Sequence, residues 1–188
     1  MIILSFCFQI SGGIGQVLNL GAGFDTLYWR LKKSGRAPSN FVEIDFPSIA
    51  ARKCKLIQKY QPLVDTLNPT GGVIRICGTD LHAADYHLVG ADLRHVEELE
   101  RKLVQVVVDT SLPTLLLAEC VLVYMDSEAS ENLLRYFART FRNSLFISYE
   151  QINMKDKFGE VMLDNLRRRG CSLLGVDRCE SLDTQRKR

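Results

Sequence analysis

The chain has 188 residues, 46% of them hydrophobic and 24% charged, which is the composition of one soluble α/β domain. Its formal net charge of +2 is too small for a dedicated nucleic-acid-binding surface, so no nucleic-acid partner is expected. The six cysteines form no C-x-x-C pair, which argues against zinc and disulfides and predicts a cytoplasmic, reducing location. The apolar start, residues 1–8, lacks the features of a signal peptide. The sequence contains no run of 18 apolar residues, so no membrane span is predicted.

Strands alternate with helices along the chain. The strand-like segments are 16–20, 41–44, 87–91, 114–119 and 144–149. The helix-like segments are 25–33, 47–60, 92 or 93 to 104, a helix capped by Asp126 or Ser127, and 158–169. Between 61 and 85 the pattern fades into a loop with one possible short strand at 73–77. This alternation predicts a doubly wound, mostly parallel sheet of Rossmann-like type.

The first predicted strand ends in a Gly-X-Gly turn, Gly21-Ala22-Gly23, which leads into a short helix. Glycine lets the backbone approach a ligand closely, although such a turn can also be purely structural. Asp45 ends the second strand at close to the roughly 20-residue offset at which a carboxylate meets the ribose of a nucleoside cofactor. These parts predict a nucleoside-cofactor site.

Acidic residues follow four of the predicted strands: Asp25, Asp45, Asp92 and Glu119. Ligands of open α/β sheets bind beyond the carboxyl ends of the strands, where these side chains gather. Asp45 can accept the ribose hydroxyls, Asp92 can accept the adenine amine while the Leu93 N–H donates to the ring, and Glu119 can hold an ammonium group. Asp25 and Asp92 can instead cap helices, and Glu119 can have a structural role.

Adenine, ribose and an amine together describe S-adenosylmethionine better than a dinucleotide. A pyrophosphate prefers G-x-G-x-x-G before a helix, but Thr26 stands at the third glycine position and Asp25 adds negative charge there. The expected cofactor is therefore S-adenosylmethionine. No metal site is expected, because His82, His87 and His95 do not have metal-ligand spacing.

Several segments resemble the leucine carboxyl methyltransferase family. They are Leu18-Asn19-Leu20-Gly21-Ala22-Gly23-Phe24-Asp25-Thr26 with Trp29-Arg30-Leu31, Glu43-Ile44-Asp45-Phe46-Pro47, Gly90-Ala91-Asp92-Leu93-Arg94, Ala118-Glu119-Cys120-Val121-Leu122-Val123-Tyr124-Met125, Tyr149-Glu150-Gln151 and Asn165-Leu166-Arg167-Arg168-Arg169. The resemblance implies a class I S-adenosylmethionine-dependent methyltransferase fold. It implies cofactor contacts at Gly21, Asp45, Asp92, Leu93 and Glu119. It also implies a substrate contact at Tyr124, which can equally be a core residue.

The resemblance further implies a substrate, the C-terminal leucine carboxylate of the protein phosphatase 2A catalytic subunit, and a monomeric enzyme. No catalytic base is assigned. Residues 1–15 differ from the helical segment that the family carries there, and 16–188 are expected to form a partial methyltransferase domain, incomplete at both termini. Two alternatives stay open: a paralogue that methylates wybutosine-type tRNA bases, and a truncated, inactive chain that acts only as a binding module.

Overall fold

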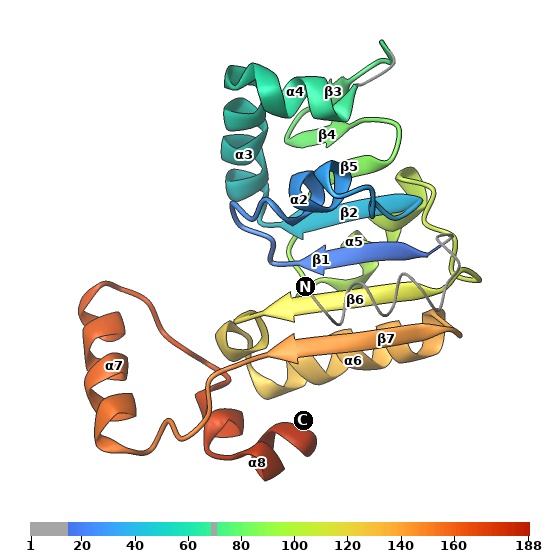
Figure 1. Ribbon diagram of the computed structural model, residues 1–188. Coiled ribbons are helices and arrows are strands. Elements are labelled where there is room, and N and C mark those ends of the chain that lie inside the picture. The colour runs from blue at the N-terminus through green and yellow to red at the C-terminus, as the bar shows by residue number, and fades with distance from the viewer. Residues whose placement is uncertain (1–14, 69–70) are drawn as a thin grey trace.

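The computed structural model describes residues 15–68 and 71–188, which form one sheet with helices on both faces (Figure 1). The sheet has seven strands in the order β3-β4-β5-β2-β1-β6-β7. The strands are β1 (Gln16–Leu20), β2 (Asn40–Asp45), β3 (Arg75–Cys77), β4 (Asp80–His82), β5 (Tyr86–Gly90), β6 (Thr114–Glu119) and β7 (Ser144–Tyr149). The five strands β5, β2, β1, β6 and β7 run parallel, while β4 pairs antiparallel with both β3 and β5.

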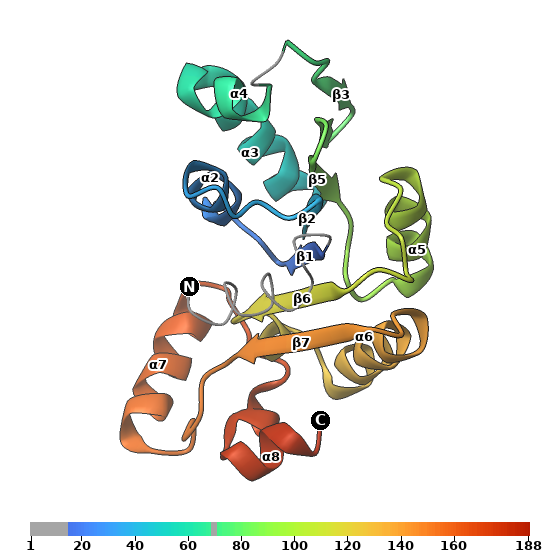
Figure 2. The same ribbon diagram turned by 45° about the vertical axis from the view of Figure 1, so that its right-hand side comes forward.

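Helices follow most of the strands, and the last two come after the final strand β7. The helices are α2 (Leu27–Lys33), α3 (Pro47–Lys59), α4 (Gln61–Leu67), α5 (Val96–Gln105), α6 (Ser127–Thr140), α7 (Lys157–Arg168) and α8 (Leu182–Arg186), with short 3₁₀ turns η1 (Leu122–Tyr124) and η2 (Val176–Cys179). Figure 2 shows α2 and α3 on one side of the sheet and α5 and α6 on the other. The predicted doubly wound, mostly parallel α/β sheet is therefore confirmed.

Two hydrophobic cores lie on the two faces of the sheet. Because side chains alternate along a strand, Val17 of β1 joins the core under α2 and α3, whereas Leu18 and Leu20 join the core under α5 and α6. All five residues of β1 are buried. A strand covered on both faces has no side open to water, so its two polar residues are paired inside the protein: Gln16 Nε2 donates to Thr114 Oγ1, and Asn19 Nδ2 donates to Asp25 Oδ2.

Residues 61–68 and 71–85 contain a helix and two short strands, where a loop with one possible short strand was predicted. Pro62 lies in the first turn of α4, where its missing N–H breaks no helical hydrogen bond, so it permits the helix instead of marking a loop. β4 has only three residues, too few for a periodic pattern, and its pairing with β5 decides its structure. The predicted strand at 73–77 forms only over β3. The next predicted helix begins at Val96 instead of 92 or 93.

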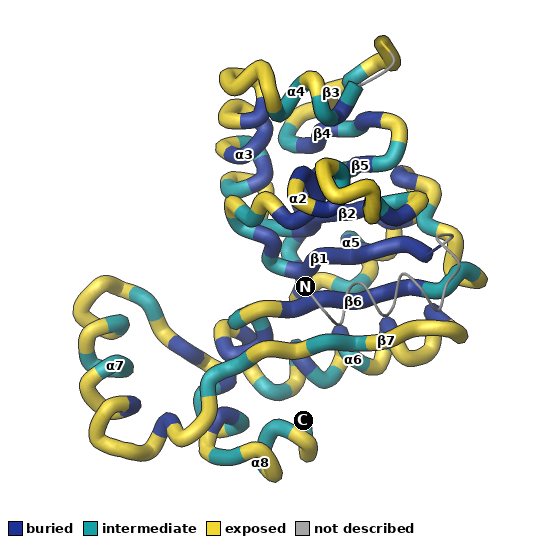
Figure 3. Tube along the Cα trace, in the orientation of Figure 1, coloured by how far each residue is buried: buried dark blue, intermediate teal, exposed yellow. Residues whose placement is uncertain are grey.

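The C-terminal segment α7–α8 leaves the sheet after β7 and lies beside its edge (Figure 1). Residues 178–188 include α8, where the Ser181 and Thr184 side chains form a reciprocal capping box. Figure 3 shows this segment and β7 as largely exposed, in contrast to β1 and β2. Within 15–68 and 71–188, none of the helices combines the length and apolar character that a membrane crossing requires.

Candidate cofactor site

A cavity of about 280 Å³ opens beyond the carboxyl ends of β1, β2, β5 and β6. It is lined by Gly21, Asp45, Phe46, Ala91, Asp92, Leu93, Arg94, Cys120, Val121, Tyr124 and Met125. Five of the six residues predicted for the site are among them. This is the position at which open α/β sheets bind ligands.

The glycine turn forms one wall of this cavity. Gly21 has φ +61°, and a Cβ there would lie only 2.6 Å from Val121 Cγ2. The Gly21 and Ala22 N–H groups both donate to the Ile44 carbonyl, at 2.7 and 3.2 Å, and so tie the turn to the end of β2. Gly21 therefore meets both requirements that favour glycine, a left-handed backbone and a close neighbour.

Asp45 is fixed against the same turn. Its Oδ2 accepts a hydrogen bond from the Gly23 N–H at 2.7 Å, and its Oδ1 accepts one from the Phe46 N–H at 2.7 Å. Each carboxylate oxygen retains capacity for a further hydrogen bond, because an ionised carboxylate offers about four acceptor sites. Asp45 can therefore hold the turn and still accept a ribose hydroxyl.

Asp92 and Leu93 follow β5 and lie on the cavity wall. The Asp92 carboxylate is held by Arg94, whose backbone N–H and guanidinium both donate to it. The hydrogen bond from the Arg94 side chain is the main reason that the pKa of Asp92 lies below its usual value. Asp92 does not cap α5, since the residue before the helix is His95.

The other predicted residues have different positions. Glu119 is the predicted residue that does not line the cavity: it ends β6 with an exposed side chain, and the next residue, Cys120, is the one in the cavity wall. Asp25 lies two residues before α2, and its Oδ1 accepts from the Thr26 and Leu27 N–H groups at 2.6 and 3.0 Å. Tyr124 lies in η1 at the cavity rim with 46% of its surface exposed, so it is not a core residue.

Six other lining residues have no role predicted from the sequence, although they belong to the quoted segments: Phe46, Ala91, Arg94, Cys120, Val121 and Met125. Phe46 directly follows Asp45, and Arg94 lies two residues after Asp92. Their position next to these strand-end acids could have marked them as cavity residues. Val121 and Met125 line the cavity with apolar side chains that have no distinctive spacing. Glu150 accepts from the Val121 and Leu122 N–H groups at 3.0 and 2.8 Å, and so anchors the loop that carries Val121 and Met125.

A buried ion pair supports the glycine turn from below. Lys53 of α3 pairs with Glu43 of β2, and both side chains are at most 5% exposed. Lys53 Nζ also donates to the Asp25 carbonyl at 2.7 Å, and the Tyr86 hydroxyl donates to Glu43 Oε2 at 2.7 Å. Burial raises the pKa of Glu43 to about 7, while Lys53 opposes that rise. The turn is thus connected to the core through a cation.

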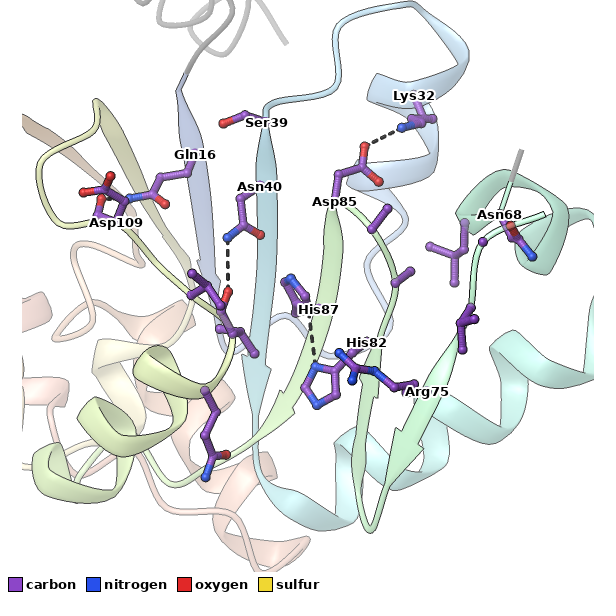
Figure 4. A pocket seen from close by; sticks show the side chains of 18 of the residues that line it. Gln16, Lys32, Ser39, Asn40, Asn68, Arg75, His82, Asp85, His87 and Asp109 are labelled. Atoms are coloured by element: carbon purple, nitrogen blue, oxygen red, sulfur yellow. Dashed lines mark hydrogen bonds and ion pairs between the residues drawn. The ribbon is translucent and has the colours of Figure 1, made fainter. Parts of the chain in front are cut away.

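A larger cavity of about 1000 Å³ lies at the opposite ends of the strands (Figure 4). It contains the cross-strand pair His82 and His87, whose Nδ1 atoms are 3.2 Å apart, and burial lowers the pKa of His87 to about 4. None of the predicted site residues lines it. It is also at the amino ends of the parallel strands, so size alone does not make it the cofactor site.

Solved structures share this fold at low sequence identity. A DUF574 family protein from Streptomyces avermitilis matches with a TM-score of 0.65 and 15% identity, covering 92% of this chain and 60% of that one. A putative methyltransferase from Thermobifida fusca matches with a TM-score of 0.59 and 15% identity, covering 89% and 57%. The fold is that of class I S-adenosylmethionine-dependent methyltransferases.

Sequence comparison identifies closer relatives. Leucine carboxyl methyltransferase 1 from Rattus norvegicus is 48% identical over 92% of this chain, and that from Caenorhabditis elegans is 41% identical over 94%. The human tRNA wybutosine-synthesizing protein 4 is 39% identical over 92% of this chain, but the match covers only 25% of that longer protein. This chain spans about half the length of the leucine carboxyl methyltransferases, 53% and 54%. The leucine carboxyl methyltransferase family model matches residues 5–138, so the chain belongs to this family.

Proposed function

We propose that the cavity at the carboxyl ends of the strands binds S-adenosylmethionine. The observation that carries this proposal is the convergence of Gly21, Asp45 and Asp92 on one cavity, with both carboxylates held in place by hydrogen bonds. Asp45 would accept from the ribose, Asp92 and the Leu93 N–H would take adenine, and Glu119 would hold the amino group at the exposed rim. S-adenosylmethionine supplies the methyl group when bound.

We further propose that the methyl acceptor is the C-terminal leucine carboxylate of the protein phosphatase 2A catalytic subunit. The relatives named leucine carboxyl methyltransferase 1 support this choice. A C-terminal carboxyl has a pKa of about 3.3–3.7, so the nucleophile is ionised at neutral pH and needs no general base. One carboxylate oxygen bonds to the methyl carbon while the carbon–sulfur bond breaks, and sulfur keeps the electron pair.

The protein's contribution would be positioning and exclusion of water, which together can lower a barrier by about 7–11 kcal/mol. Tyr124 stands at the rim, where an acceptor would approach, and its half-exposed ring can contact an extended peptide end. Burial raises the pKa of its hydroxyl, so Tyr124 stays a neutral hydrogen-bond donor at neutral pH.

Calorimetric titration of this chain with S-adenosylmethionine tests the first proposal. We expect saturable binding, and Asp45→Asn should weaken it by about tenfold or more, because the amide cannot accept as the carboxylate does. The matched control is Asp65→Asn on the exposed side of α4, where affinity should not change. Absence of saturable binding by the unaltered chain would reject the cofactor site.

A methyl-transfer assay then decides the acceptor. A peptide that ends in the leucine of the phosphatase should become a methyl ester, whereas the same peptide amidated at its C-terminus should not react. Undermodified tRNA is the competing acceptor, because the wybutosine-synthesizing relative is 39% identical. Methylation of tRNA but not of the peptide would overturn the proposed substrate, and cofactor binding without turnover would identify a binding module.

A further inference from the structure

Arg94 surrounds the carboxylate that faces the cavity at the end of β5. Its Nε lies 3.0 Å from Asp92 Oδ1 and 3.1 Å from Oδ2, and its Nη2 lies 2.6 Å from Oδ2. Its backbone N–H adds a fourth hydrogen bond, 3.0 Å to Oδ1. Both carboxylate oxygens are therefore held by one residue two positions away.

Arg94 is itself supported from a second strand end. Its guanidinium carbon lies 5.7 Å from the ring centre of Phe46, and Phe46 directly follows Asp45 at the end of β2. A guanidinium over an aromatic face is attracted to the ring and loses freedom to rotate. Phe46 and Arg94 thus connect the loop that carries Asp45 with the loop that carries Asp92.

Partial burial of Asp92 distinguishes its ion pair with Arg94 from a fully exposed surface ion pair. The Asp92 side chain is only 15% exposed, whereas that of Arg94 is 44% exposed. Partial burial limits solvent screening of the carboxylate, and the fork geometry fixes its plane as a single contact would not. The exposed side of Arg94 also means that the residue is not part of the hydrophobic core.

Three N–H groups of Arg94 hold the Asp92 carboxylate, because the Nε–H is shared between the two oxygens, so about one of the roughly four acceptor sites stays open to a ligand. An ionised carboxylate is an acceptor only, so that open site recognises a hydrogen-bond donor. A purine with an exocyclic amine donates to it, whereas a purine with a carbonyl at the same position places oxygen against oxygen. A site built around one hydrogen-bonding group rejects a ligand that leaves that group unpaired far more strongly than a site that merely fits by shape.

Resting on the cofactor site proposed above, we propose that Arg94 is a positioning residue that holds Asp92 in the orientation that selects an amine-bearing purine over a carbonyl-bearing one. Its action is indirect, through Asp92. Loss of Arg94 should therefore reduce discrimination between the two purines more than it reduces binding as a whole.

The test measures two affinities for each variant of the full chain. The probes are S-adenosylhomocysteine and its deaminated analogue S-inosylhomocysteine, in which a carbonyl replaces the amine. The unaltered chain should prefer the adenosyl compound, and Arg94→Met should lower the ratio of the two affinities by about tenfold. Arg94→Lys should recover only part of the ratio, since an ammonium cannot form the planar fork.

Arg52 provides the matched control. Its guanidinium carbon lies 5.6 Å from the Phe24 ring in a similar exposed arginine–aromatic pair. Arg52→Met should leave the affinity ratio unchanged. Phe46→Ala keeps Arg94 but removes its support, so it should lower the ratio by less than Arg94→Met does.

The possible outcomes are separable. If Arg94→Met leaves the ratio of the two affinities unchanged, whether or not both compounds bind more weakly, then the positioning role is overturned while the cofactor site stays intact. Failure of the unaltered chain to bind S-adenosylhomocysteine would reject the cofactor site and this inference with it.

Discussion

The sheet body and the C-terminal segment differ sharply in how they are held. Every residue of β1 is buried, and β2 is buried over four of its six positions, because helices cover both faces of these strands. In β7 no residue is fully buried, and Gly159 is the one buried residue of α7. The body therefore has a core of its own, whereas α7 and α8 depend on a small satellite cluster.

That satellite cluster reaches the cavity rim. Leu173, Met154 and Cys179 pack around Val123 of η1, and the Gly175 N–H donates to the Val123 carbonyl at 2.9 Å. Tyr124, the rim residue, comes next in the chain. The two regions thus divide the work: the body forms the cavity at the carboxyl ends of the strands, and the C-terminal segment positions one side of its entrance.

Replacing Lys53 by Met should produce the largest loss of stability. At pH 8 Glu43 would stay buried without its cation, and breaking a buried pair costs about 3–5 kcal/mol. Urea unfolding followed by Trp29 fluorescence measures this change in the free energy of unfolding.

The matched control is Lys55→Met, two residues along α3 and exposed, which should change stability by no more than about 0.5 kcal/mol. If both variants lose the same small amount, then the buried ion pair does not stabilise the body.

Glycines with a left-handed backbone occur in both regions and sharpen the comparison. Gly21→Ala combines backbone strain with a Cβ that would meet Val121 Cγ2 at 2.6 Å, so it should cost about 2–4 kcal/mol. Gly170 after α7 has φ +72° and open space around it, so Gly170→Ala should cost only about 1–2 kcal/mol. The urea midpoint at unchanged slope measures the cost at Gly21, and amide hydrogen exchange within α7 measures the cost at Gly170, because α7 can open without unfolding the sheet. Equal costs would show that contact with Val121 is unimportant.

The sheet was predictable where its pattern is strong. The bounds of β1, β6 and β7 match the predicted 16–20, 114–119 and 144–149, because each is a mostly apolar segment that ends in a clear change of pattern. The helix α4 and the strand β4 were missed. Pro62 suits both a loop and a first helical turn, and three residues of β4 cannot show a period.

The cavity was predictable to a similar extent. Acids at strand ends meet in space because parallel strands end at one edge, and this rule located Asp45 and Asp92. The hydrogen bonds that fix them were not predictable. Nothing in the sequence indicates that Lys53 pairs with Glu43, and only the packing of α3 on β2 shows it.

The buried carboxyl of Glu43 should make the body sensitive to pH. Its pKa is about 7 in the folded protein, against an ordinary value of 4.5 for the unfolded chain, so the folded state binds more protons between these values. The free energy of unfolding should consequently decrease as pH rises from about 4.5 to 7, by up to about 3 kcal/mol from this group. Comparison of urea unfolding for the unaltered chain and Glu43→Gln isolates the effect. Parallel pH profiles for the two proteins would contradict it.

The smallest predicted effects come from two matched helix caps. Asp126 accepts from the Ala129 N–H at 2.8 Å at the start of α6, and Asp156 accepts from the Gly159 N–H at 2.7 Å at the start of α7. Asp126→Ala should lower global stability by about 1 kcal/mol, since α6 packs on the main core. Asp156→Ala removes an equivalent bond, but α7 can open without unfolding the sheet. Its effect should therefore appear as faster amide hydrogen exchange within α7, with little change in the urea midpoint. A global loss as large as that of Asp126→Ala would show that α7 unfolds together with the body.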